Sequence, residues 1–171
     1  MVYTNCEIAL GRGRCRVHDS RPPNRSLARA WILLCLALTL HVFDEATTGF
    51  LGVYNPTVLA LRERFGWWPM PTFEFGEWLV GLIVACVALL ALSGAVSRGV
   101  KGTRVVAYIF ATIMLLNAAS HTLASIFGRT VASVMFPRPA PGFWSSPIMA
   151  AAALYLLVQL RRSRQEQMKT Y

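Results

Sequence analysis

The five residues His41-Val42-Phe43-Asp44-Glu45 place an imidazole and two carboxylates in a segment that is otherwise apolar. No charged side chain occurs in residues 31–40, which precede them. In an α-helix, positions i, i+3 and i+4 lie on one face, so the three ionisable groups are expected to project together. Each such group is costly inside a bilayer, roughly 2.5–3.5 kcal/mol for Asp on insertion scales. The cluster therefore predicts a functional site.

A second polar pair, Asn117 and His121, lies in a later apolar segment, four residues apart and so again on one helix face. Glu77 begins another apolar segment and is a further candidate. Two histidines with two carboxylates can bind a divalent transition metal, because imidazole and carboxylate ligands suit zinc, iron and manganese. Without a metal, the same groups can act as general acid and base.

Several interpretations of these polar residues remain open. The candidate catalytic residues, which are also the ligands if a metal is bound, are His41, Asp44, Glu45 and His121; the candidate binding residues are Asn117 and Glu77. One interpretation is an intramembrane acid–base enzyme that acts on an apolar substrate. A second is a protein that binds a small molecule or an ion without catalysis, and a third is a divalent-metal site. A structural network that joins the helices is the remaining alternative.

The composition predicts an integral membrane protein. Of 171 residues, 55% are hydrophobic and 15% are charged, against roughly 25% charged in soluble domains. The net charge of +9 does not predict nucleic-acid binding, since the basic residues stand between apolar runs, as they do in the loops of membrane proteins. The expected partners are therefore the lipid bilayer and an apolar small-molecule ligand.

Four apolar segments predict an all-α fold, a four-transmembrane-helix bundle. The predicted spans cover residues 27–50, 77–97, 104–127 and 143–160, and Ser145-Ser146-Pro147 is expected to cap the last of them. Asn55-Pro56 is typical of an N-cap followed by proline in the first turn. It predicts a short interfacial helix after the first span, ending at Gly66.

Charge predicts the orientation of these spans. The chain divides into a disordered basic cytoplasmic tail (1–28), a membrane domain (29–161) and a second cytoplasmic tail (162–171). Thirteen of the 17 Lys and Arg residues lie in residues 1–29, 98–104 and 161–171, so both termini of this multi-pass cell-membrane protein are expected in the cytoplasm. At 1.5 Å rise per residue, His41 then lies about 18 Å and His121 about 25 Å from the inner ends of their helices. The two polar groups should meet in the outer half of the bilayer.

These motifs resemble those of the HXXEE-domain membrane proteins, small bacterial proteins of unknown function. The His-x-x-Glu-Glu motif of that family matches His41 to Glu45, with Asp44 in place of the first Glu. A second family histidine matches His121. The family's Tyr-x-Pro-Gly motif matches Pro139-Ala140-Pro141-Gly142, which lacks the tyrosine. The resemblance covers residues 30–160 and implies an integral membrane protein without implying an activity.

Overall fold

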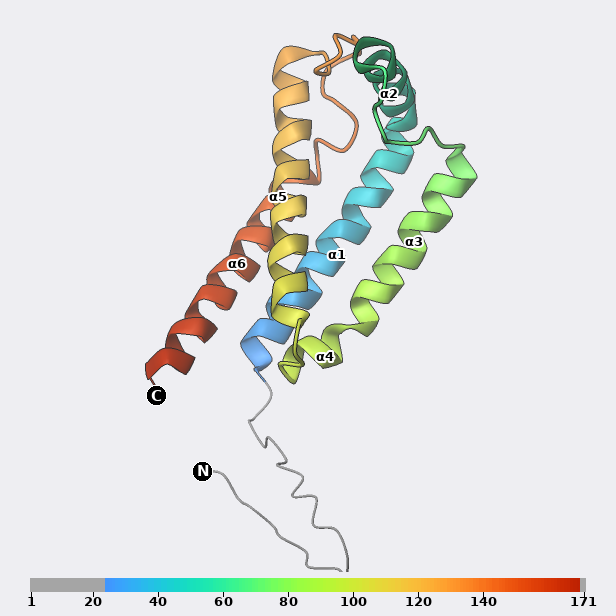
Figure 1. Ribbon diagram of the computed structural model, residues 1–171. Helices are drawn as coiled ribbons and strands as arrows, with labels where there is room; N and C mark the ends of the chain where they lie inside the picture. Colours follow the sequence, from blue (N-terminus) through green and yellow to red (C-terminus); the bar gives the residue numbers. More distant parts are fainter. Residues whose placement is uncertain (1–23, 170–171) are drawn as a thin grey trace, which may run out of the picture.

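The structure, a computed structural model, describes residues 24–169 and is all-helical, as predicted. Its helices are α1 (Arg25–Thr48), α2 (Leu51–Phe65), α3 (Phe75–Ala91), α4 (Ser93–Ser97), α5 (Thr103–Phe127) and α6 (Ser146–Lys169). The described residues form no strand, only an isolated bridge between Arg129 and Met135. α1 is the central helix and packs against α3, α4, α5 and α6, while α2 lies across one end of the bundle (Figure 1).

Three helical segments, 25–48, 75–97 and 103–127, are long and apolar enough to cross a membrane. The second combines α3 and α4, which meet at a break at Leu92. Beside this break, the buried Trp31 donates its indole N–H to the carbonyl of Leu89 at 2.8 Å. The structure buries 50% of the most apolar window of 25–48 but only 11% of that of 75–97. α3 therefore leaves most of its apolar surface for lipid, which indicates a membrane protein.

Small and apolar residues allow the helices to approach one another closely. Ala107 and Ala111 of α5 are fully buried, and Trp31 packs its ring against that of Phe110 at 5.2 Å. The fully buried residues of α6 recur every three or four positions, at Met149, Ala153, Leu156 and Leu160. This spacing places one apolar stripe of α6 against α1 and α5.

The sequence prediction that the fourth helix ends near Leu160 is wrong, because α6 continues to Lys169. Ser163, buried in the extra turns, accepts a hydrogen bond from Arg104 of α5 at 2.6 Å. This contact holds the last part of α6 against the start of α5. α6 is not among the segments that meet the criterion for a span. The predicted tail 1–28 falls largely outside the described residues, but α1 already begins at Arg25.

The predicted N-cap at Asn55 is also wrong, because α2 begins at Leu51. Gly49 ends α1 in the left-handed conformation, and the N–H groups of Val53 and Tyr54 bond at once to the carbonyl of Phe50, so a new helix starts before Asn55 is reached. The Asn55 amide instead donates to the carbonyl of Phe73 at 2.9 Å and accepts from the N–H of Phe73 at 3.1 Å. The predicted end of α2 at Gly66 is confirmed.

The chain between α5 and α6 contains no α-helix and descends beside the bundle, so that α6 begins well below the C-terminal end of α5 (Figure 1). Two of its backbone N–H groups are satisfied by side chains of α1. The N–H of Gly142 donates to Thr48 Oγ1 at 3.2 Å, and that of Ser145 donates to Asp44 Oδ2 at 2.8 Å. Irregular backbone at membrane depth is tolerated only where protein satisfies it. The polar residues at the end of α1 therefore help to hold this segment in place.

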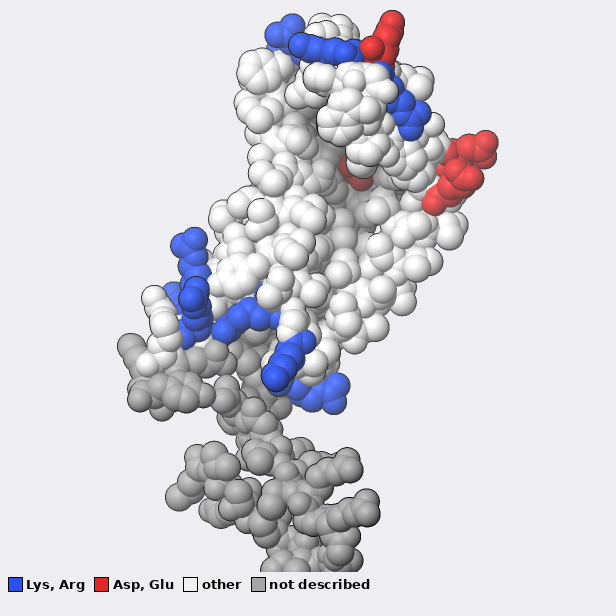
Figure 2. Space-filling model, viewed as in Figure 1, with Lys and Arg blue, Asp and Glu red and all other residues white. Residues whose placement is uncertain are grey.

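On the face that Figure 2 shows, the Lys and Arg side chains lie at the two ends of the bundle, and the acidic side chains lie at one end or in a recess just below it. The charged residues at the end that carries α4 are mostly basic and include Arg98, Lys101, Arg161, Arg162 and Arg164, with Glu166 of α6 as an acidic one. The end that carries α2 has both signs, including Arg62, Glu63, Arg64, Glu74 and Glu77. This distribution is typical of a protein whose middle lies in lipid.

Candidate functional site

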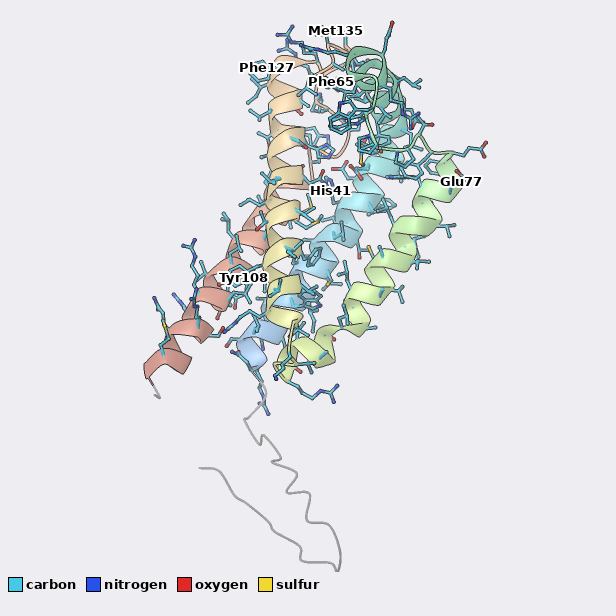
Figure 3. The ribbon with its side chains drawn as sticks, viewed as in Figure 1. His41, Phe65, Glu77, Tyr108, Phe127 and Met135 are labelled. Atoms are coloured by element: carbon cyan, nitrogen blue, oxygen red, sulfur yellow. The ribbon has the colours of Figure 1, made fainter. Side chains whose placement is uncertain are left out.

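α1 and α5 bring their polar residues together, as the helix periodicity predicted. His41, labelled in Figure 3, and Glu45 lie one turn apart on α1. His121 faces them from α5, with the two imidazole ring centres 4.8 Å apart. The three side chains are buried, at 1%, 5% and 6% exposure. One potential ligand atom from each lies within 4.8 Å of the other two. We refer to His41, Glu45 and His121 as the His–Glu–His centre.

A single carboxylate oxygen joins the centre. Oε1 of Glu45 is 3.1 Å from Nε2 of His121 and 3.4 Å from Nε2 of His41. Whether Nε2 of each histidine donates a hydrogen bond to Glu45 depends on the tautomer of the ring. The hydrogen-bond partner of Nδ1 determines that tautomer.

The His121 tautomer is fixed by a backbone carbonyl. Nδ1 of His121 contacts the carbonyl oxygen of Pro141, which can only accept a hydrogen bond, so Nδ1 carries the proton. A neutral imidazole has one N–H, which leaves Nε2 with a lone pair directed at Glu45.

The His41 tautomer is fixed by a serine and a carboxylate. The Ser145 hydroxyl donates to Asp44 Oδ2 at 2.8 Å, so it accepts from His41 Nδ1, also at 2.8 Å. His41 Nε2 then has the lone pair, and it accepts a hydrogen bond from the Asn117 amide at 3.0 Å. Asn117, predicted as a binding residue, therefore belongs to the site.

The centre as a whole needs a cation. The lone pairs of His121 Nε2 and Glu45 Oε1 face each other in a buried space, and these two groups repel one another unless a positive charge lies between them. That charge is either a proton shared among them or a metal ion.

No protein family, curated protein or solved structure matches the chain. The function is therefore inferred from the chemistry of the site itself.

Asp44 and Glu77 have other positions. Asp44 turns away from the convergent atoms, and its Oδ2 accepts both the backbone N–H and the hydroxyl of Ser145, where α6 begins. It thus neutralises a helix N-terminus and orients His41 through Ser145. Contrary to the expectation from sequence, Glu77 does not approach the centre (Figure 3), because its exposed side chain closes a capping box with Glu74 at the start of α3.

Sequence reasoning did not assign Gly142 and Ser145 to the site. Ser145 was expected only to cap a helix, whereas its side chain binds His41 and Asp44. Gly142 has φ +78°, and a Cβ there would lie 2.9 Å from Cε1 of both histidines and 3.0 Å from Cγ of Glu45. The motif Pro139–Gly142, singled out only by resemblance, therefore covers the centre.

A cavity of about 660 Å³ adjoins the site between α2, the C-terminal half of α5 and the chain that follows α5. His121 and Asn117 line it at the depth of the centre. Most of its wall is apolar and includes Phe50, Val53, Leu123, Phe127 and Phe136. Tyr54 also lines it. Burial raises the pKa of the Tyr54 phenol while Arg62 lowers it less, so the hydroxyl stays protonated and donates to the carbonyl of Pro71 at 3.0 Å.

Proposed function

We propose that this protein is an integral membrane enzyme whose His–Glu–His centre binds a divalent transition-metal ion and acts on an apolar or amphiphilic molecule in the adjoining cavity. The observation that carries the proposal is the convergence of two Nε2 lone pairs and Oε1 of Glu45 in a buried space. Two histidines and one carboxylate form the ligand set of several catalytic zinc and iron sites.

The two distances from the Glu45 carboxylate oxygen suit such an ion. Zinc lies about 2.0–2.1 Å from nitrogen and oxygen ligands, which places the atoms of a tetrahedral site roughly 3.3 Å apart. The distances from Glu45 Oε1, 3.1 Å to His121 and 3.4 Å to His41, fit this spacing. Metal-binding histidines generally donate their other ring N–H to a carbonyl or a carboxylate. His121 does so to Pro141, and His41 does so to Asp44 through Ser145.

Three protein ligands leave a coordination position for water or substrate, as in catalytic rather than structural metal sites. A bound ion would supply Lewis acidity and a water of lowered pKa. Asn117 lines the cavity beside His41 and is placed to hydrogen-bond a polar group that enters from that side. The apolar wall favours the hydrocarbon part of a substrate.

A second candidate is a metal-free acid–base centre, which the Asn117 contact favours. The amide N–H donates to Nε2 of His41 at 3.0 Å and so occupies a lone pair that a metal would need. In this form Glu45 and His121 share a proton, and the pair exchanges it with a substrate in the cavity. Binding a metal requires the Asn117 amide to rotate away or to present its oxygen.

The membrane placement belongs to the same proposal. α6, together with the chain that descends to it, forms the fourth crossing, and both termini lie in the cytoplasm. The basic end that carries α4 supports this orientation, because cytoplasmic loops are enriched in Lys and Arg. Residues that match three motifs of the HXXEE-domain family meet at one site, and this supports membership of that family. These residues are His41, Glu45, His121 and Gly142.

Metal analysis of the purified full-length protein tests the function. After dialysis against zinc, we expect about one ion per chain, and His121→Ala or His41→Ala should lose it because three ligands become two. Elemental analysis of detergent-solubilised protein provides the measurement.

The control excludes zinc binding by the N-terminal segment, which carries the potential ligands Cys6, Cys15 and His18. A variant with Cys6→Ser, Cys15→Ser and His18→Ala should keep its ion. If that variant loses the ion while His121→Ala keeps it, or if no zinc, iron or manganese is retained by the wild type, the metal centre is refuted. In the metal-free case the acid–base candidate stands alone.

Ser145→Ala should weaken metal binding without abolishing it. It removes the group through which Asp44 orients the His41 ring, and loss of such an outer partner typically lowers affinity by about 10–100-fold. Competition with a chromophoric chelator measures the change. Ser163→Ala is the matched control, since Ser163 is also buried on α6 but contacts Arg104. Equal affinities for the wild type and Ser145→Ala would mean that His41 does not bind through Nε2.

A further inference from the structure

The cavity beside the His–Glu–His centre is polar at both ends and apolar between them. At its inner end lie Asn117 and His121. At its outer end, just beyond α5, lie Arg129, Thr130 and Ser133. Phe127, the last residue of α5, lies about 9 Å along the helix axis from His121 at 1.5 Å rise per residue. An extended molecule can therefore contact both ends at once.

Arg129 supplies a charge at the outer end. It lines the cavity, its side chain is exposed, and it forms no ion pair or hydrogen bond with the residues that the structure describes. No carboxylate lines the cavity with it. A guanidinium at the level of lipid headgroups is a strong partner for phosphate or carboxylate groups.

The cavity also has access from the membrane. Leu123 and Phe127, which line it, are exposed on α5, a helix that is apolar enough to span a bilayer. Val131, exposed on the chain that follows, extends the same apolar edge. A hydrocarbon chain can thus enter from the lipid without crossing water.

We propose that the cavity binds an anionic amphiphile, with its phosphate or carboxylate group at Arg129 and its hydrocarbon chain along the apolar wall toward His121. This assignment rests on the proposed function for the identity of the reacting group, but the binding itself does not require the metal. The substrate of the centre is then a lipid-like anion whose reacting bond lies deeper in the membrane than its charge. A neutral lipid lacks the group that Arg129 recognises, and a free anion lacks the chain.

The test measures retention of radiolabelled dodecyl phosphate by the full-length protein in nanodiscs of zwitterionic phospholipid, corrected for empty nanodiscs. Wild-type protein should retain it with saturation. Arg129→Gln should bind it about tenfold more weakly, since a charge-assisted contact is lost, and should bind dodecanol as the wild type does. Arg64→Gln is the matched control, because Arg64 carries the same charge at the same end but lies over Phe65, outside the cavity lining. It should bind dodecyl phosphate normally.

Blocking variants test the apolar wall. Ala124→Phe on α5 and Val53→Phe on α2 project into the cavity from opposite sides, so each should weaken binding of both dodecyl phosphate and dodecanol. Equal losses in Arg129→Gln and Arg64→Gln, or normal binding in both blocking variants, would overturn the proposal. So would retention of inorganic phosphate alone as tightly as dodecyl phosphate.

The outcome is separable from that of the metal experiment. His41 does not line the cavity, so metal-free His41→Ala should still retain dodecyl phosphate, and Arg129→Gln should still bind zinc. Retention without metal binding would refute only the metal centre. Metal binding without retention would refute only the amphiphile site.

Discussion

Glu45→Gln should abolish metal binding and leave the metal-free protein at least as stable as the wild type. The carboxylate presents lone pairs to the lone pairs of His41 and His121, at 3.4 and 3.1 Å. A glutamine amide in the same place can donate an N–H to Nε2 of His121. It is also neutral and so costs less to bury. The metal would lose its charged ligand. The metal-free fold would lose a buried carboxylate that requires a shared proton to offset its charge.

Two measurements in the same detergent check this prediction. Zinc affinity should fall by more than about 100-fold, since changing even an outer partner of a ligand costs 10–100-fold. The unfolding temperature with a chelator present should not fall. Glu77→Gln, on the exposed first turn of α3, is the control and should change neither quantity. If Glu45→Gln lowers the unfolding temperature of metal-free protein by about 5 °C or more, Glu45 is part of a structural network instead.

This contrast separates function from structure because the two alternatives predict opposite signs. A residue that holds helices together contributes stability, so a neutral substitution at that residue lowers the free energy of unfolding. A residue that serves ligand binding lowers the stability of the ligand-free fold, so a neutral substitution at that residue restores stability. The burial of Glu45 beside two imidazole nitrogens makes the cost large enough to measure.

The pairing of α1 and α5 was predictable from the sequence because it depends only on local rules. Helix periodicity places His41 and Glu45 on one face, and helix rise places His121 at nearly the same depth. The structure confirms that these residues meet. Neither rule states which carboxylate faces the histidines. Glu45 does so and Asp44 does not, because Ser145 at the start of α6 binds Asp44.

The rest of the site comes from contacts between distant parts of the chain. Ser145 lies 104 residues from His41 and belongs to a segment without helical periodicity, so no pattern pointed from one to the other. α6 extends past Leu160 through residues 161–169, which contain no Gly or Pro, and Arg104 of α5 binds Ser163 in the added turns, a contact that composition does not predict. Asn55 was typical of an N-cap, but its amide binds the backbone of Phe73 instead. At Ser145 and Asn55, a tertiary contact outweighed the local signal.

Gly142→Ala should lower the free energy of unfolding by about 2–5 kcal/mol. About 1–2 kcal/mol comes from the left-handed backbone that a non-glycine residue resists, because φ of Gly142 is +78°. A further 1–3 kcal/mol or so comes from overpacking, because the new Cβ would meet ring carbons of His41 and His121 at 2.9 Å. Equilibrium unfolding in mixed micelles measures the total.

Gly66→Ala separates the two contributions. Gly66 has nearly the same backbone conformation, with φ +71°, and nothing within 4 Å of an added Cβ. It should therefore show the conformational cost alone, and the difference between the two variants is the cost of the contact with the histidines. Gly142→Ala should also lose zinc affinity, since moving the chain takes the Pro141 carbonyl away from His121. Equal destabilisation of both variants with normal zinc affinity would mean that the chain before α6 does not contact the His–Glu–His centre. The histidine tautomers inferred from those contacts would then be wrong.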